Sequence, residues 1–160
     1  MRFTRLQDWL TWIESCHPDE IELGLGRVAA VAAQLNCDFS TTKVVTVAGT
    51  NGKGSCVAAL SAVLQAAGYR SGCYTSPHFI HYNERIQVDG RDIDDRSLID
   101  SFARIDHARG AIELTYFEYG TLAALDILSR ARLDVVILEV GLGGRLDAVN
   151  IIDADVAVVT

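Results

Sequence analysis

The chain has 160 residues, enough for one domain with a substantial hydrophobic core. Apolar residues make up 49% of it and its formal net charge is −7, which argues against a nucleic-acid binder because such proteins are usually basic. No apolar run is long enough to span a bilayer, and no apolar segment follows the first residues as in a signal peptide. We therefore expect a cytoplasmic protein that binds neither nucleic acid nor membrane, with its four scattered cysteines reduced.

The first half of the chain begins with two predicted helices and then alternates between strand and helix. Apolar residues recur at helical spacing over 4–15, and a second helix with an alanine and valine face covers 27–35, ending at Asn36. A loop at 17–24 separates these helices. The later elements are a strand at 44–48, a helix at 55–67 that Gly68 ends, and a strand at 71–75.

The second half contains a predicted hairpin, two helices and two strands. The hairpin covers 84–94 around an Asp89-Gly90 turn, and helices are expected at 96–107 and 116–130. The apolar runs 134–140 and 155–160 are typical of central strands buried on both faces. This order predicts an α/β fold with a mostly parallel sheet flanked by helices and a small hairpin insertion. Because the last run has no loop and covering helix after it, we expect the sheet to be incomplete and the chain to be a fragment.

A glycine-rich segment, Gly-Thr-Asn-Gly-Lys-Gly-Ser at 49–55, follows the predicted strand 44–48 directly. It departs from the usual phosphate-loop pattern, because Val47 replaces the first glycine and Gly54 stands where the hydroxyl residue should be. A glycine-rich turn with an incidental lysine is the alternative. The density of suitable residues favours a nucleotide phosphate site, formed by Gly49, Thr50, Asn51, Gly52, Lys53, Gly54 and Ser55.

Two further positions lie where parallel strands end. Glu139 closes the apolar run 134–140, where a carboxylate suits a Mg²⁺ ligand, although bonds to nearby loop N–H groups would also explain it. Ser76 follows the strand 71–75 and precedes Pro77. His78 and His81 come next, and lone histidines of this kind are more often structural than ligands.

The segment Thr115–Glu118 reads as a T-x-x-E capping box for the helix that follows. This explanation is complete in itself. A ligand role could coexist with it, since a helix N-terminus can also receive an anion, but the spacing alone does not show one.

Taken together, these segments resemble the folylpolyglutamate synthase/dihydrofolate synthase family of the wider Mur ligase group. The matching stretches are IELGLGRV, VAGTNGKGS, YTSPHFIHYNERI, LTYFEYGTLAAL and LDVVILEVGLGGRLDAVNIIDADVAVVT, spread over 21–160. In this family the loop reads G-T-N-G-K-G-[ST], so Gly54 belongs to the pattern. The last two stretches resemble most closely the bifunctional bacterial form.

The resemblance implies roles for particular residues. Lys53 and Glu139 would be catalytic, with Ser76 and Glu139 binding the Mg²⁺ that bridges the ATP phosphates. The pterin site would be lined by Thr115, Tyr116, Phe117, Glu118, Leu146, Asp147 and Ala148, together with Glu22, Leu23 and Gly24. His78 and the loop to Arg85 would form a mobile segment over the site. Gly26 departs from the family, in which a charged residue is frequent at this position.

The implied reaction is ATP-dependent addition of L-glutamate to dihydropteroate and to reduced folates, through an acyl phosphate. The resemblance also implies that residues 1–160 are the N-terminal portion of the ATP-binding domain. A further Mg²⁺ ligand, a second cation site and a C-terminal glutamate-binding domain would lie beyond it. We therefore expect these residues alone to be inactive and prone to self-association, and the full-length enzyme to be monomeric. The alternatives are a Mur ligase for a cell-wall precursor, a non-catalytic nucleotide-binding module and a solely tail-extending synthase.

Overall fold

The computed structural model describes residues 1–17 and 24–160. Its helices are α1 (Leu6–Ser15), α2 (Gly26–Leu35), α3 (Lys53–Ala66), α4 (Asp95–Ala108) and α5 (Tyr116–Arg130), with short 3₁₀ helices η1 (Tyr82–Arg85) and η2 (Ala148–Ile151). Its strands are β1 (Lys43–Ala48), β2 (Ser71–Tyr74), β3 (Ile86–Val88), β4 (Arg91–Asp92), β5 (Val135–Glu139) and β6 (Val156–Val159). The predicted elements are therefore all present, within two residues of their expected starts and ends.

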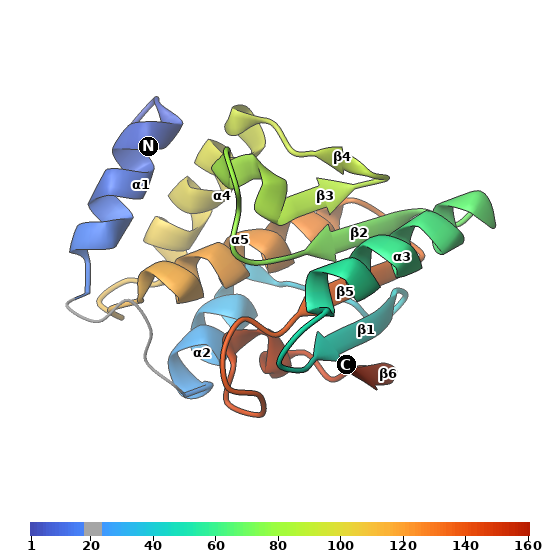
Figure 1. The fold of residues 1–160 in the computed structure, drawn as a ribbon. Coiled ribbons are helices and arrows are strands. Elements are labelled where there is room, and N and C mark those ends of the chain that lie inside the picture. The colour runs from blue at the N-terminus through green and yellow to red at the C-terminus, as the bar shows by residue number, and fades with distance from the viewer. Residues whose placement is uncertain (18–23) are drawn as a thin grey trace.

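One six-stranded sheet organises the chain, in the order β4-β3-β2-β5-β1-β6. Strands β2, β5, β1 and β6 run parallel, and the β3–β4 hairpin joins β2 antiparallel. Helix α3 covers one face, while α1, α2, α4 and α5 lie on the other (Figure 1). The expected α/β architecture with a hairpin insertion is confirmed.

Strand β5 occupies the centre of the sheet and is buried along its whole length. On one side its apolar residues join a large core shared with α1, α2, α4 and α5, and on the other a smaller core shared with α3. The run of aliphatic residues in 134–140 thus follows from burial on both faces.

Short polar signals fix several of the breaks between elements. Asn36 ends α2 with a left-handed φ of 55°, and Asp89 and Gly90 turn the hairpin with φ values of 51° and 73°. Asp94 accepts a hydrogen bond from the Ser97 N–H at 2.7 Å and caps α4. Thr115 caps α5 in the predicted box.

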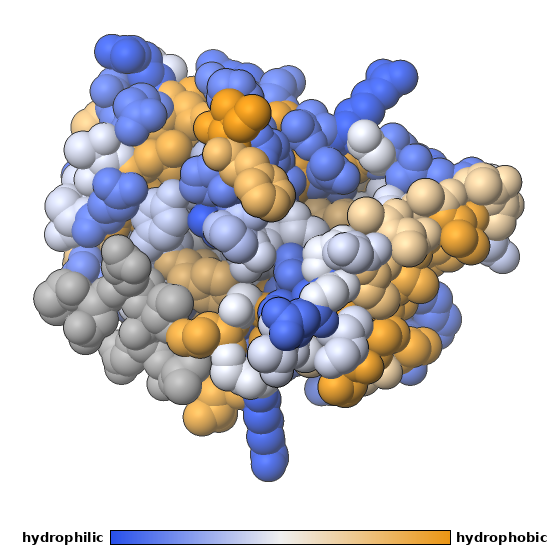
Figure 2. Space-filling view, in the orientation of Figure 1, coloured by the Kyte–Doolittle hydropathy of each residue, from blue (hydrophilic) through white to orange (hydrophobic). Residues whose placement is uncertain are grey.

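Strand β6 contains the apolar residues of the last predicted run. Within the described residues it pairs with β1, and its Val156 and Val159 are 53% and 80% exposed. Its aliphatic composition matched that of β5, but burial depends on what packs against each face. Helix α3 also leaves apolar residues such as Val63 in contact with solvent (Figure 2).

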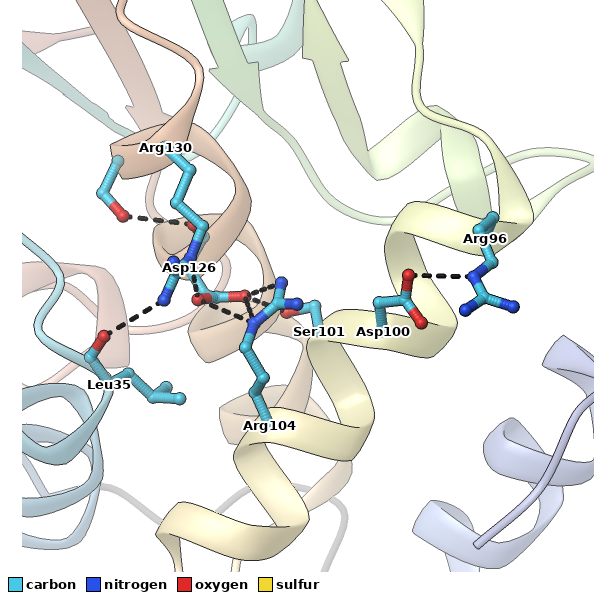
Figure 3. A network of polar contacts seen from close by, with 8 residues as sticks. Leu35, Arg96, Asp100, Ser101, Arg104, Asp126 and Arg130 are labelled. Carbon is cyan, nitrogen blue, oxygen red and sulfur yellow. Dashed lines mark hydrogen bonds and ion pairs between the residues drawn. The ribbon is translucent and has the colours of Figure 1, made fainter. Parts of the chain in front are cut away.

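A buried carboxylate ties α5 to α4. Asp126 is fully buried and accepts hydrogen bonds from Ser101, Arg104 and Arg130 (Figure 3). Burial raises the pKa of Asp126, but the two arginines and the serine lower it further, so its pKa lies below the ordinary value. The charge is thus stabilised inside the helical layer.

None of the helices in the described ranges is both long and apolar enough to cross a membrane. All four cysteines are free, and burial raises the pKa of Cys37 to about 11, which leaves that thiol protonated and unreactive.

Candidate nucleotide and substrate site

The residues predicted to handle phosphate meet at one edge of the sheet. The loop 49–52 follows β1, Glu139 ends β5, and Ser76 lies two residues after β2. Because β5 lies between β1 and β2 and the three strands are parallel, their carboxyl ends open at the same edge. Ligands of open α/β sheets bind in this position.

The phosphate loop has the backbone geometry that its glycines allow. Gly49 and Gly52 have φ values of 141° and 81°, in the range that favours glycine. No side chain caps the N-terminus of α3, and no acidic residue lies in its first turn. Helix α3 starts at Lys53, two residues earlier than predicted, so the lysine and the free N–H groups share one helix end.

The lysine lies across its own loop. Lys53 Nζ donates a hydrogen bond to the Gly49 carbonyl at 2.9 Å. Thr50, Asn51, Gly54 and Ser55 are exposed, which leaves the loop open to a ligand.

Ser76 and Glu139 are direct neighbours. The Ser76 N–H donates to Glu139 Oε2 at 3.0 Å, although Glu139 is only 4% exposed. The alternative that a loop N–H satisfies this carboxylate is therefore partly correct, with the donor in a different loop from the glycines that follow β5. One hydroxyl and one carboxylate are hard oxygen donors of the kind that Mg²⁺ prefers.

A cavity of about 560 Å³ joins these groups. Gly52, Gly54 and Ser55 line it on the side of α3, and Ser76 and Glu139 line it at the ends of β2 and β5. This cavity brings the predicted phosphate loop and both predicted metal ligands around one space.

A second cavity, of about 530 Å³, adjoins the first. Ser76 and Pro77 line both cavities. The remaining lining residues of the second are Glu14, His17, His78, Arg85, Tyr116, Phe117, Gly141 and Leu142. Of the residues predicted to line the pterin site, Tyr116 and Phe117 face this space, beside charged and imidazole groups.

Two of the other predicted pterin-site residues are buried in the capping box. Glu118 Oε2 accepts from the Thr115 N–H at 2.8 Å, and Thr115 Oγ1 accepts from the Glu118 N–H at 3.2 Å. Arg27 on α2 donates to Glu118 Oε1 at 3.0 and 3.2 Å. The sequence reasoning missed this ion pair, because nothing local links residues 91 positions apart.

The loop after β5 is held from within by Asp147. Its carboxylate accepts from the N–H groups of Leu142 at 2.8 Å and Val149 at 3.1 Å, and burial raises its pKa despite these bonds. Leu146 is half exposed and Ala148 is buried. Asp147 therefore shapes the loop that carries Leu142 into the second cavity. Gly24 lies two residues before α2, while Glu22 and Leu23 lie outside the described residues.

Two lining residues of the second cavity, Glu14 and His17, come from the end of α1 and just after it. Nothing in the sequence pattern of 4–17 separates them from solvent-facing residues of an amphipathic helix. Only the packing of α1 beside α5 brings them to the site.

No family model matches the chain. Over 155 residues it is 56% identical to the dihydrofolate synthase/folylpolyglutamate synthase of Escherichia coli strain K12, which covers 97% of this chain and 37% of that protein. A structure described as E. coli FolC in complex with DHPP and ADP matches with a TM-score of 0.95 at 55% identity, covering 98% of this chain and 38% of that one. A bifunctional folylpolyglutamate synthase/dihydrofolate synthase with Mn, AMPPNP and L-glutamate bound matches with a TM-score of 0.91 at 51% identity, with the same two coverages. The chain thus spans little more than a third of the length of these relatives.

Proposed function

Because the chain belongs to the dihydrofolate synthase/folylpolyglutamate synthase family, we propose that it forms the ATP-binding part of a ligase. This ligase adds L-glutamate to dihydropteroate and to the tails of reduced folates. Residues 1–160 are then the N-terminal portion of the ATP-binding domain, and the glutamate-binding domain belongs to the further length that the relatives have. We also propose that the enzyme works in the cytosol.

One observation carries this proposal: the two cavities share Ser76 and Pro77. A phosphate held by the loop 49–55 and an acid held beside Tyr116 and Phe117 would meet at Ser76. Transfer of a phosphoryl group between two ligands requires them to meet in this way, with the attacking and leaving oxygens roughly in line at the phosphorus.

The residues suit the parts that the reaction needs. The free N–H groups at the start of α3 would bind phosphate oxygens, and Lys53 would turn from the Gly49 carbonyl toward the β- and γ-phosphates. Ser76 and Glu139 would hold Mg²⁺, which when bound neutralises charge on the phosphate oxygens. Across residues 1–17 and 24–160, no cluster of three or more His, Cys, Asp or Glu could hold a metal by itself. Mg²⁺ commonly takes its other ligands from phosphate and water.

The chemistry is two successive displacements. A carboxylate oxygen of the substrate forms a bond to the γ-phosphorus, and the bond from that phosphorus to the bridging oxygen breaks, releasing ADP. The amine of glutamate then attacks the carbonyl carbon of the acyl phosphate. The C–O bond to phosphate breaks, the nitrogen loses a proton, and an amide and inorganic phosphate remain. Positioning and charge neutralisation by the loop and Lys53 lower the barrier of the first step.

The test is ADP release by the protein at its full natural length, given ATP, Mg²⁺, dihydropteroate and L-glutamate, with each organic substrate omitted in turn. Release that needs both substrates is the expected result. Release with reduced folates but not dihydropteroate would leave only tail extension. No release with either would overturn the proposal and favour a cell-wall ligase or a nucleotide-binding module.

A further inference from the structure

Arg85 is a buried cation beside the meeting point of the two cavities. It ends η1, immediately before β3, and only 8% of it is exposed. Its carbonyl accepts a hydrogen bond from the Thr75 N–H at 2.9 Å, which places its backbone beside the residue that precedes Ser76. Arg85 and Ser76 both line the second cavity.

No carboxylate in the described parts of the chain neutralises Arg85. Its Nε donates to His78 Nδ1 at 2.9 Å, and its guanidinium lies over the rings of Tyr82 and Tyr116, 5.1 and 5.8 Å from their centroids. Glu14 lines the same cavity but forms no ion pair with it.

Other arginines at partly buried positions do have carboxylate partners. Arg27 pairs with Glu118, Arg109 with Asp106, and Arg104 with Asp126. Burying a charge without a counter-ion is costly, and cation–π contacts offset only part of that cost. Arg85 therefore has the features of a group that awaits an anion in the cavity it lines.

We propose that Arg85 binds the carboxylate of an aromatic acid in the second cavity and holds it toward Ser76. This inference rests on the proposed function and names the group that positions the acid for phosphoryl transfer. A guanidinium can donate two parallel hydrogen bonds to a carboxylate, which fixes its orientation. Tyr116 and Phe117 supply aromatic wall for the ring of the acid.

The same contact aids the first displacement in a second way. The negative charge of the γ-phosphate repels an anionic carboxylate that approaches it. Arg85 would offset that repulsion while leaving one oxygen lone pair free to form the new bond to phosphorus. Removing Arg85 should therefore weaken binding of the carboxylate form of the ligand rather than binding of the aromatic ring.

The experiment compares two ligands by calorimetry, in the protein at its full natural length: dihydropteroate and its uncharged carboxamide analogue. Wild type should prefer the carboxylate by about tenfold to a hundredfold, the range expected for hydrogen bonds to a charged group. Arg85→Gln should bring the two affinities within about twofold of each other. The control Arg96→Gln, which removes an exposed charge on α4 paired with Asp100, should keep the wild-type preference.

An unchanged preference in Arg85→Gln would overturn the inference and leave Arg85 as a structural support for His78. A wild-type protein that binds both ligands equally would also overturn it, while leaving the ligase proposal intact. If wild type binds neither ligand, the proposed function and the inference both fail. Should Arg85→Gln lose the wild-type circular dichroism spectrum, Arg85→Lys decides. Its ammonium keeps the charge without the planar fork, so the preference should fall by about tenfold, and an unchanged preference would refute the role.

Discussion

Substituting Gly141 by alanine should disturb both cavities at once. Gly141 follows the strand that Glu139 ends, and a Cβ there would lie 2.6 Å from two ring atoms of Phe117 and 3.1 Å from Ser76 Oγ. Carbon atoms in contact prefer about 3.5–4.0 Å, so the ring has to move by roughly 1 Å. A displacement of that size at a reacting group can reduce turnover by about a hundredfold.

The assay is kcat/KM for ADP release with dihydropteroate varied, alongside urea unfolding. We expect kcat/KM to fall by about 10- to 100-fold, with a loss of about 1–3 kcal/mol in stability from overpacking. Gly26→Ala is the matched control, because a Cβ at that exposed position meets no described atom within 4 Å. A Gly141→Ala enzyme with wild-type kcat and KM would refute the placement of Phe117 and Ser76 around one site.

Three more predictions follow from the same geometry. Lys53→Ala should abolish turnover without changing the fold. Lys43→Ala, which removes an exposed ion pair with Asp155, should leave turnover intact. An active Lys53→Ala enzyme would contradict the role of Lys53 in phosphate binding. Asp126→Asn should lower the free energy of unfolding by about 1.5–3 kcal/mol at pH 7. Because the pKa of Asp126 is lower in the folded than in the unfolded protein, this loss should be complete above about pH 5 and shrink as the pH falls toward the folded pKa. Urea unfolding at several pH values checks it. Asp94→Ala removes the cap of α4 and should lower stability by about 1 kcal/mol in the same measurement, an unchanged midpoint arguing against the cap.

Short-range chemistry explains why much of the fold could be predicted from the sequence. The Asp89-Gly90 turn, the left-handed Asn36 and the Thr115–Glu118 box each depend on residues within a few positions of one another. The candidate site could be predicted from the sequence for a related reason. Parallel strands place their carboxyl ends at one edge, so locating Ser76 and Glu139 after strands brings them together without knowledge of packing.

Long-range contacts set the limit of that reasoning. The pairing of Arg27 with Glu118 and the approach of α1 to the second cavity depend on how helices pack, which no local pattern encodes. Arg85 was visible in the sequence only as the last residue of a polar loop, and its burial came from the rings around it.

Ser76 and Glu139 are proposed to hold a divalent metal between the phosphate loop and the second cavity. The most direct test is a crystal structure of the full-length protein with AMPPNP and Mn²⁺, with the metal located by its anomalous scattering. We predict a peak at coordination distance, about 2.1 Å for a site of the Mg²⁺ type, from Ser76 Oγ and a Glu139 carboxylate oxygen, with the triphosphate on the loop 49–55. A metal bound elsewhere, with Glu139 still bonded only to the Ser76 N–H, would contradict the claim.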